Sequence, residues 1–449
     1  MIALDVFAND QLVGVLSHDA DQNRFAFEYA STWRDDKSRY PLSPQIPIDP
    51  PQSETAEQHS ARVRQFFENL LPEGEALDHA AQSAGVAKSN LAGLLISIGK
   101  ETAGALRVKL HAKAGAGNDD EAPDSTLTEI TKEELSHRIR DRANQPFSVW
   151  DGKVRLSIAG YQDKIAVYER DGRWFLVDGG PLASTYIVKP LPARKQLETL
   201  PANEHFSMRL ARAAGIPAAE TKLVHVPEPV LFVRRFDRWE EAAAVRRLHV
   251  IDGCQALGMS VAMKYERAYG DGADVANLRE GVSFPKLFAL LDHASVPALD
   301  KLKLLRWAIF QVLIGNADAH GKNISFFYDA AGLRLAPAYD IVSIDALDAG
   351  LPTNFAMAVG DAFAEQDLNA YEWAHFAFLC KLPFRQVATE LQRLTKRVQE
   401  AVPKLAGEML QEGVSQEVIQ RITDRVNKSC SQHGQYADKV KAFKLSDFT

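Results

Sequence analysis

A dense group of polar side chains stands in the octapeptide Asn316-Ala317-Asp318-Ala319-His320-Gly321-Lys322-Asn323. Apolar spacing predicts a long helix over 301–315 before it, and the run Ile324-Ser325-Phe326-Phe327 after it predicts a strand. Asp318 and Asn323 have the five-residue spacing of the protein-kinase catalytic loop. There the carboxylate orients the attacking hydroxyl and accepts its proton, while the carboxamide oxygen ligates Mg²⁺. The octapeptide therefore indicates phosphoryl transfer, with His320 and Lys322 as further nucleotide contacts.

A second carboxylate follows in the stretch Pro337-Ala338-Tyr339-Asp340-Ile341, at the end of the next predicted strands. An aspartate at such a strand end bridges the metal to the phosphates in kinases. Taken singly, Asp318 could cap a helix and Asp340 could begin a turn. The ordered set of Asp318, Asn323 and Asp340 favours a metal-dependent phosphotransferase that uses ATP and Mg²⁺.

The overall composition is that of a folded protein with more than one domain. The chain has 449 residues, of which 46% are hydrophobic and 25% charged, with a formal net charge of −7. A surface of this charge is not built to attract phosphate backbones, so any contact with DNA needs a local patch or a partner. The sequence also lacks the Gly-x-x-x-x-Gly-Lys-Ser/Thr pattern of P-loop NTPases and the Gly-x-Ser-x-Gly elbow of hydrolases.

Three widely spaced cysteines, Cys254, Cys380 and Cys430, exclude a disulfide framework and a cysteine zinc cage. The first residues carry no basic flank followed by an apolar core, and no apolar run approaches the roughly 20 residues that cross a bilayer. We therefore expect a cytoplasmic protein that has no contact with membranes.

The pattern of polar and apolar residues divides the chain into domains. Alternating residues in 1–17 predict a β-hairpin with its turn at Asn9-Asp10, and helices over 57–70 and 90–99 precede a strand over 103–110. This gives a small α+β domain at 1–111. Residues 112–128 hold almost no large apolar side chains, so they are expected to form an exposed linker.

Residues 129–240 are expected to form a β-rich lobe that binds the nucleotide, and residues 241–449 a mostly helical catalytic lobe. One helix, over 203–214, interrupts the β-rich lobe and ends at Gly215. The expected fold is α+β, two-lobed and protein-kinase-like. The predicted strands lie at 164–168, 174–177, 185–189, 221–226 and 230–234, and the later helices at 387–402 and 408–427.

A candidate phosphate-binding loop reads Ser157-Ile158-Ala159-Gly160-Tyr161-Gln162-Asp163-Lys164, between two β-like runs. Such a loop lays backbone N–H groups over phosphates, although a single glycine also fits a plain hairpin turn. Lys189 ends an apolar strand and is a candidate for neutralising phosphates; the alternative is a lysine at a strand edge. Glu204, near the start of the next helix, could pair with Lys189 or simply favour the helix N-terminus.

The stretch Val230–Arg238 is an apolar strand that runs into charged residues. A hinge at this place would offer groups near Arg234 and Phe236 to the adenine ring, whereas the competing interpretation is an Arg–Asp pair on the surface. A metal site built from His249, Asp252 and His320 matches no ligand spacing and is not expected.

Short motifs along nearly the whole sequence resemble those of the HipA-like serine/threonine kinases, toxins of bacterial toxin–antitoxin systems. The resemblance rests on motifs that follow the order of that family. They are Val13–Leu16, Phe66–Gly74, Ala103–Leu106, Ser157–Gly160, Gln162, Lys164, Ile187–Lys189, Asn203-Glu204, Arg235–Arg238, Asp252–Gly258, Lys264–Glu266, Ile314–Asn323 and Pro337–Ile341.

The resemblance implies roles for individual residues. Asp318 would be the catalytic base, Asn323 and Asp340 would be the Mg²⁺ ligands, and Gln255 would line the nucleotide cleft. Ser157 is similar to the serine that the family autophosphorylates, where added negative charge would disfavour nucleotide binding. Phosphate contacts would come from Lys189 and from the loop formed by Ile158, Ala159, Gly160, Tyr161, Gln162, Asp163 and Lys164.

The resemblance also implies partners. These are a HipB-like helix-turn-helix antitoxin, operator DNA reached mainly through that antitoxin, and a protein substrate such as an aminoacyl-tRNA synthetase. Tyr161 departs from the small residue common in the family, and Arg234 stands where a glutamate can occur. Two other functions stay open from the sequence: a phosphotransferase for small molecules, and a non-catalytic co-repressor.

Overall fold

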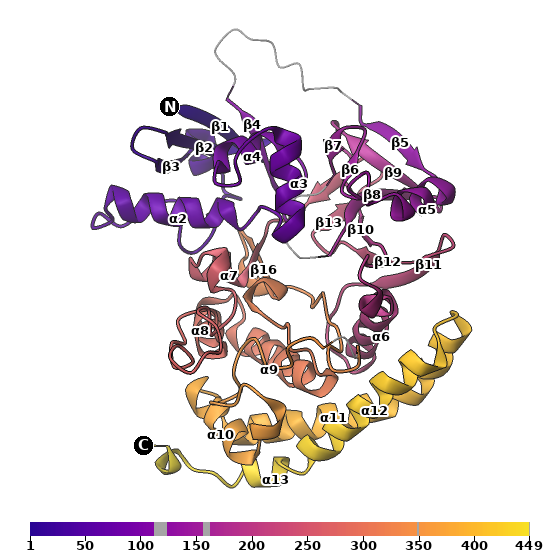
Figure 1. The fold of residues 1–449 in the computed structure, drawn as a ribbon. Coiled ribbons are helices and arrows are strands. Elements are labelled where there is room, and N and C mark those ends of the chain that lie inside the picture. The colour runs from indigo at the N-terminus through magenta and orange to yellow at the C-terminus, as the bar shows by residue number, and fades with distance from the viewer. Residues whose placement is uncertain (112–123, 156–161, 348–349, 449) are drawn as a thin grey trace. The chain divides into compact units, whose positions relative to one another are not determined.

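The computed structural model describes residues 1–111, 124–155, 162–347 and 350–448, and the chain forms two compact units (Figure 1). Strands dominate the first, called here the sheet unit, and helices dominate the second, called the helical unit. The sheet unit comprises Met1–Pro190, Val224–Val261 and Phe326–Gly332, and the helical unit comprises Leu191–Leu223, Ala262–Ser325 and Leu333–Thr449.

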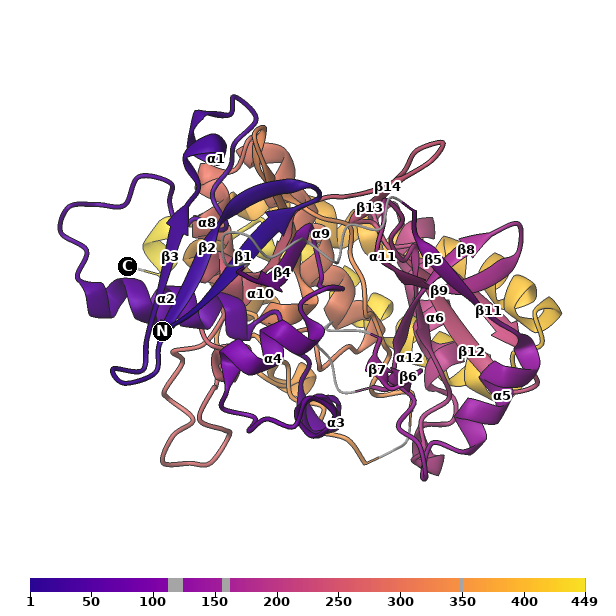
Figure 2. The ribbon, with the colours of Figure 1, turned by 90° about the horizontal axis from the view of Figure 1, so that it is seen from above.

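The sheet unit begins with a four-stranded antiparallel sheet in the order β3-β2-β1-β4 (Figure 2). Its hairpin turns at Asn9, whose positive φ of 53° suits the tight connection, so the predicted hairpin is confirmed. Alternate residues of β1 face the core, with Leu4 and Val6 buried. The strands are β1 (Ile2–Ala8), β2 (Gln11–Asp19), β3 (Arg24–Tyr29) and β4 (Leu106–Leu110).

Four helices accompany this sheet. A capping box at Thr55 starts α2, which packs against β3, and Asn90 caps the start of α4. These two confirm the helices predicted near 57–70 and 90–99, whereas α3 was not predicted. The bounds are α1 (Ser31–Asp35), α2 (Ala56–Glu68), α3 (Gly74–Ala84) and α4 (Leu91–Ile98).

A second, six-stranded sheet has the order β11-β12-β10-β8-β9-β5. One face packs against α5 (Lys132–Arg140) in a core that includes Ile139, Trp174, Val188 and Phe232. The strands are β5 (Thr126–Ile130), β8 (Ile165–Arg170), β9 (Arg173–Asp178), β10 (Tyr186–Lys189), β11 (Thr221–His225) and β12 (Pro229–Arg234).

Strand β5 begins inside the range 112–128 that the sequence predicts as a linker. Its polar residues form a strand because they pair along β9, from Thr126 opposite Asp178 to Ile130 opposite Trp174. Residues 112–123 lie outside the described part of the chain. The domain boundaries at 111, 128 and 240 stay predictions.

Shorter elements complete the sheet unit and its connections. A two-stranded ribbon joins β13 to β14, and β15 and β16 are neighbours in a small sheet. The bounds are β6 (Val149–Trp150), β7 (Lys153–Val154), β13 (Arg238–Glu240), β14 (Val245–Arg247), β15 (Val250–Asp252), α7 (Gly253–Leu257), β16 (Ser325–Asp329) and β17 (Gly332–Leu335).

The helical unit is built around α9 and α11. Helix α11 runs beside α12 (Figure 1) and also contacts α6 and α9. Most residues of α9 after Leu304 are buried. The bounds are α6 (Leu200–Ala213), α8 (Phe284–Leu290), α9 (Pro297–Ile314), α10 (Ala370–Leu379), α11 (Phe384–Gln411), α12 (Gln416–Gly434) and α13 (Ala437–Val440).

The predicted division of the last long helices is wrong. The sequence suggests helices over 387–402 and 408–427, but α11 continues through Pro403 to Gln411 and α12 starts only at Gln416. A proline inside a helix removes one backbone hydrogen bond. Packing of α11 against α6, α9, α10, α12 and α13 offsets that loss.

Cys254, Cys380 and Cys430, all in the described part of the chain, are buried and outside any disulfide. Burial raises the pKa of the Cys430 thiol to about 12 and that of Cys380 well above its usual value. Within the described residues, no helix is both long and apolar enough to cross a membrane.

Candidate active site

The Asp318 loop (residues 315–323) begins where α9 ends. Buried side chains on α9 fix the helix in the core, and Gly315 ends it in the left-handed conformation with a φ of 72°. Its N–H donates to the carbonyl groups of Gln311 and Val312, as expected for a glycine helix end. A Cβ at this position would lie 2.6 Å from Nε of Arg425 and 2.9 Å from Oδ2 of Asp345, so the turn needs glycine.

Hydrogen bonds inside the loop fix its shape. Nδ2 of Asn316 donates to Oε1 of Gln311 at 2.9 Å, and the backbone N–H of Asp318 donates to Oδ1 of Asn316 at 3.2 Å. Nδ2 of Asn323 donates to the carbonyl oxygen of Asp318 at 2.8 Å. This bond joins the two residues whose spacing marked the loop, and it turns the carboxamide oxygen of Asn323 away from Asp318.

The carboxylate of Asp318 is exposed but held. Its side chain is 53% exposed, and Oδ1 accepts a hydrogen bond from the hydroxyl of Tyr265 at 2.6 Å. Nε2 of His320 lies 4.0 Å from the same oxygen. Its neighbours in the loop, His320, Lys322 and Asn323, are all buried. The carboxylate of Asp318 is therefore exposed to solvent, while the other polar side chains of the loop are buried.

Asp340 lies in an uncommon backbone conformation in the same unit. Its φ is 56°, in the left-handed region that few residues other than glycine adopt. The preceding residue is anchored to the Asp318 loop, because the hydroxyl of Tyr339 donates to the carbonyl oxygen of Lys322 at 2.6 Å. Backbone strain that the surroundings hold in place gathers at functional sites.

The segment after Asp340 is tied to the two helices on which the site is built. The hydroxyl of Ser343 donates to the carbonyl of Ile314 at the end of α9. Asn203 on α6 exchanges two hydrogen bonds with the backbone of Ser343, at 2.8 and 3.0 Å. Asp318, Asn323 and Asp340 therefore share one rigidly connected part of the helical unit.

The other candidate phosphate contacts lie in the sheet unit. Lys164 and Lys189 are both buried at the same end of the antiparallel β8–β10 pair, each next to the paired residues Ile165 and Val188. Nε2 of Gln162 donates to the carbonyl of Pro190 at 3.1 Å. Burial raises the pKa of the Asp163 carboxyl. Five candidates, Ser157, Ile158, Ala159, Gly160 and Tyr161, lie outside the described residues.

Lys189 and Glu204 fall in different units. Glu204 is buried in α6 and Lys189 is buried at the end of β10. The ion pair between them stays a prediction.

The remaining predicted nucleotide contacts have structural partners. Arg234 pairs with Glu240 at 3.0 Å on the surface, and Phe236 packs edge-on against Phe327. Gln255 forms the capping box that starts α7 and donates from Nε2 to the carbonyl of Phe66 at 3.1 Å. Both polar atoms of the Gln255 side chain, Oε1 and Nε2, therefore already form hydrogen bonds within the protein.

The charged residues after β12 do not form the surface pair that the sequence left open. The side chains of Arg235 and Arg238 are only 1% exposed, and each forms ion pairs with both Asp237 and Glu101. Arg247 forms a further ion pair with Glu101. Burial by itself raises the pKa of Glu101, but the three guanidinium groups outweigh it and lower that pKa to about 2. These five residues are named the Glu101 cluster.

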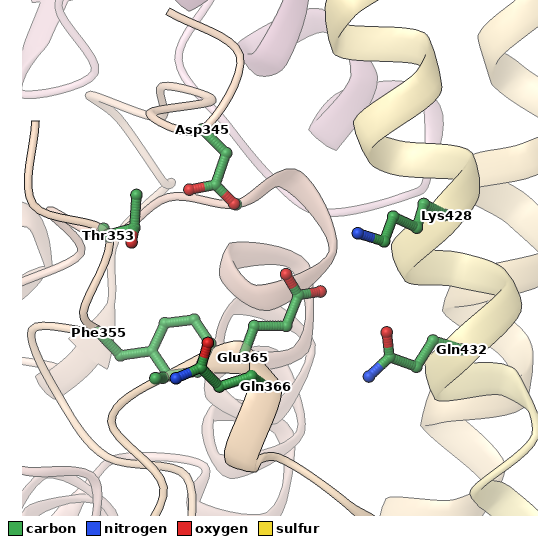
Figure 3. Close-up of a pocket in the computed structure, with 10 residues that line it drawn as sticks. Asp345, Thr353, Phe355, Glu365, Gln366, Lys428 and Gln432 are labelled. Carbon is green, nitrogen blue, oxygen red and sulfur yellow. The ribbon is translucent and has the colours of Figure 1, made fainter. Parts of the chain in front are cut away.

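A polar pocket of about 250 Å³ adjoins the Asp318 loop within the helical unit (Figure 3). Asp345, Glu365 and Lys428 point toward it from three different segments. Its lining also includes Gly315, Ala317, Thr353, Phe355, Ala364, Gln366 and Gln432.

Sequence reasoning missed the contact of Tyr265 with Asp318. The tripeptide Lys264-Tyr265-Glu266 stood out only as a motif, and no spacing rule relates a tyrosine to an aspartate 53 residues further on. The metal site from His249, Asp252 and His320, not expected from the sequence, has its residues in two units. His249 is buried, and its Nε2–H donates a hydrogen bond to the carbonyl oxygen of Leu42 at 2.8 Å.

Comparison with known proteins gives matches over nearly the full length. A family model described as HipA N-terminal domain matches residues 4–109, and one described as HipA-like C-terminal domain matches residues 156–407. The serine/threonine-protein kinase toxin HipA of Shewanella oneidensis is 39% identical over 90% of this chain and 89% of its own. The putative kinase Y4mE of Sinorhizobium fredii is 34% identical over 90% of this chain and 91% of its own.

A solved structure gives the same result. The HipA chain in a complex of Shewanella oneidensis HipA, HipB and operator DNA matches with a TM-score of 0.85 and 36% identity. The match covers 98% of this chain and 100% of that one. The expected protein-kinase-like α+β fold is confirmed.

Proposed function

The chain belongs to the HipA family of serine/threonine-protein kinase toxins, and we propose that it transfers the γ-phosphoryl group of ATP to a hydroxyl of a protein substrate. The observation that carries this proposal is the arrangement of Asp318, Asn323 and Asp340. All three lie in one hydrogen-bonded part of the helical unit, on two loops joined through Tyr339.

The donor set fits Mg²⁺. This ion takes oxygen ligands, usually from one or two protein groups together with substrate phosphates. The carboxamide oxygen of Asn323 is available because its nitrogen donates to Asp318, and Asp340 adds a carboxylate on a backbone held in an uncommon conformation. When bound, Mg²⁺ would neutralise charge on the phosphates.

Asp318 would serve as the catalytic base. Its exposed carboxylate would accept a hydrogen bond from the substrate hydroxyl, orient it for in-line attack and take its proton. Lys189 and the loop over residues 158–164 would hold the phosphates, with His320 and Lys322 as further contacts. Arg234 and Phe236 would lie near the adenine, and Gln255 would shape the cleft through the start of α7 rather than through its own polar ends.

The biological setting is proposed from the relatives. The Shewanella oneidensis protein is named a toxin and has been solved with HipB and operator DNA. We extend this to a HipB-like antitoxin that would carry the present chain to DNA, in accord with its net charge of −7. The substrate would be an aminoacyl-tRNA synthetase in the cytoplasm, and autophosphorylation at Ser157 would switch the kinase off.

Incubation with γ-labelled ATP and Mg²⁺ tests this function. We expect label on the chain itself, located at Ser157 by mass spectrometry and lost in Ser157→Ala. Asp318→Ala should remove both the label and any growth arrest on expression. Growth arrest that survives Asp318→Ala would disprove a catalytic origin of toxicity, and label found only on a small-molecule acceptor would favour a small-molecule phosphotransferase.

A further inference from the structure

The contact of Tyr265 with Asp318 stands out because it uses only one of the two carboxylate oxygens. The hydroxyl of Tyr265 donates to Oδ1 at 2.6 Å. No other hydrogen bond to this carboxylate occurs among the described residues, and His320 remains at 4.0 Å. A carboxylate with one oxygen fixed and one open has a defined direction in which to receive a second hydroxyl.

Tyr265 is fastened to the Asp318 loop on its N-terminal side. The backbone N–H of Gly321 donates to the carbonyl of Lys264 at 2.8 Å. A Cβ at Gly321 would meet Cγ2 of Val282 at 2.5 Å, so glycine permits this close approach. The Tyr265 ring also packs edge-on against His320, with ring centroids 5.0 Å apart. The tyrosine and the aspartate are therefore parts of one local structure.

The C-terminal side of Tyr265 is fixed as firmly. Glu266 is buried, and its carboxylate pairs with Arg279 at 2.6 Å and accepts from the N–H of Ala358 at 2.8 Å. Its own N–H donates to the carbonyl of Ala356, whose N–H in turn donates to the carbonyl of Ala317 in the Asp318 loop. A side chain held from both ends suits a permanent support for Asp318 better than a group that leaves when substrate arrives.

We propose that Tyr265 is a positioning residue that fixes the carboxylate of Asp318 through Oδ1 and leaves Oδ2 to receive the substrate hydroxyl. This inference rests on the proposed function, in which Asp318 is the base. Tyr265 would contribute to the rate of phosphoryl transfer and not to nucleotide affinity. A general base has to keep hydrogen-bond reach and direction toward the proton it takes.

The test compares Tyr265→Phe with Tyr265→Ala and with a matched control. Tyr265→Phe keeps the ring against His320 and removes only the hydroxyl. Tyr269→Phe makes the same change on the same segment at a tyrosine that is 57% exposed. Each variant is assayed for single-turnover labelling of the chain by γ-labelled ATP and Mg²⁺, for affinity toward the β,γ-imido analogue of ATP, and for melting temperature.

We expect Tyr265→Phe and Tyr265→Ala to slow labelling about tenfold. Hydrogen bonds to charged groups are worth on the order of ten- to a hundredfold, and the exposure of Asp318 puts this one at the low end. Nucleotide affinity and melting temperature of Tyr265→Phe should match the wild type, and Tyr269→Phe should label at the wild-type rate. A normal rate for Tyr265→Phe, a faster one, or a loss of affinity or stability in proportion to the rate would overturn the proposal.

Asp318→Asn separates this inference from the proposed function. If Asp318→Asn becomes labelled at least about a hundredfold more slowly than wild type, the function stands whatever Tyr265 does. In the double variant, Tyr265→Phe should cause no further loss beyond Asp318→Asn, since both act on one carboxylate. An additional tenfold loss would place the action of Tyr265 elsewhere and contradict the positioning account. Equal labelling of wild type and Asp318→Asn would overturn both the function and the inference.

Discussion

The Glu101 cluster and the Asp318 loop are both charged, and both carry family motifs, yet they use charge in opposite ways. In the cluster, Arg235 and Arg238 are 1% exposed and their guanidinium groups bind both Asp237 and Glu101. In the loop, Asp318 is 53% exposed and has one hydrogen bond to its carboxylate. Charge paired inside the protein holds segments together, whereas charge held at the surface with a free oxygen can meet a substrate.

The ion pairs of the Glu101 cluster connect two segments that lie far apart in the sequence. Glu101 precedes β4 in the N-terminal part of the sheet unit, and Arg235, Asp237 and Arg238 follow β12. Asp237 also accepts a hydrogen bond from the N–H of Gly104 at 2.7 Å, where a φ of 75° requires glycine. The charged side chains of Arg235, Asp237 and Arg238 thus connect the segment after β12 to the segment before β4.

The largest effect is expected for Asp318→Asn. Removing the general base should lower the rate of labelling by γ-labelled ATP between roughly a hundred- and ten-thousandfold. Because the side chain is exposed, the melting temperature should stay near that of the wild type. A loss of stability with normal activity in Asp318→Asn would contradict the contrast between the two regions, because that is the result expected for a buried ion pair.

The next effect is expected for Asp237→Asn. It leaves three guanidinium groups with one carboxylate in a largely buried site, which should cost about 3–5 kcal/mol of unfolding free energy. Urea unfolding followed by circular dichroism measures the loss. An Asp237→Asn protein of normal stability and reduced nucleotide affinity would instead make the cluster a binding site.

A similar but pH-dependent effect is expected from His249. Burial lowers the pKa of its imidazole from 6.5 to about 4, so below pH 6.5 the unfolded chain takes up a proton that the folded chain refuses. Folding stability is therefore full above pH 6.5 and falls as the pH drops to 4, by about 3 kcal/mol in all. Urea unfolding at pH 7 and pH 5 should show a smaller difference in His249→Gln than in wild type.

The matched control for His249 is His225→Gln, at an exposed histidine in the same unit. Identical slopes for both variants would show that His249 does not titrate as its burial demands.

The smallest effect is expected for Glu240→Gln. The pair of Arg234 with Glu240 is 48% and 42% exposed, so its loss should change unfolding free energy by less than about 0.5 kcal/mol. Urea unfolding of Glu240→Gln and Asp237→Asn under the same conditions compares a surface ion pair directly with a buried one. A loss above 1 kcal/mol would mean that exposure does not separate the two kinds of pair.

Local patterns in the sequence predicted much of the fold. The alternation in 1–17 gave the β1–β2 hairpin, and the apolar period before Gly315 gave α9 and its end. Helix boundaries around Pro403 failed, because contacts with distant helices outweigh the local cost of proline. Strand β5 was not predicted for the same reason, because its polar residues form a strand only by pairing with β9.

The candidate site divides in the same way. The loop with Asp318 and Asn323 was visible because its spacing is local. The contact of Tyr265 with Asp318 and the attachment of Glu101 to Arg235 join residues 53 and 134 positions apart. A single sequence records no such neighbours, since they arise only when the chain folds.

The burial of Cys254, Cys380 and Cys430 has a practical consequence for experiments in solution. A thiol reacts with maleimide dyes as its thiolate, so the raised pKa of Cys380 and Cys430 and the burial of all three leave the native chain nearly unlabelled at neutral pH. Cysteines introduced at the exposed positions Lys153 in the sheet unit and Glu417 in the helical unit would then accept a donor and an acceptor dye. Energy transfer between them would test whether the distance between the two positions changes when ATP is added, without first removing a native cysteine.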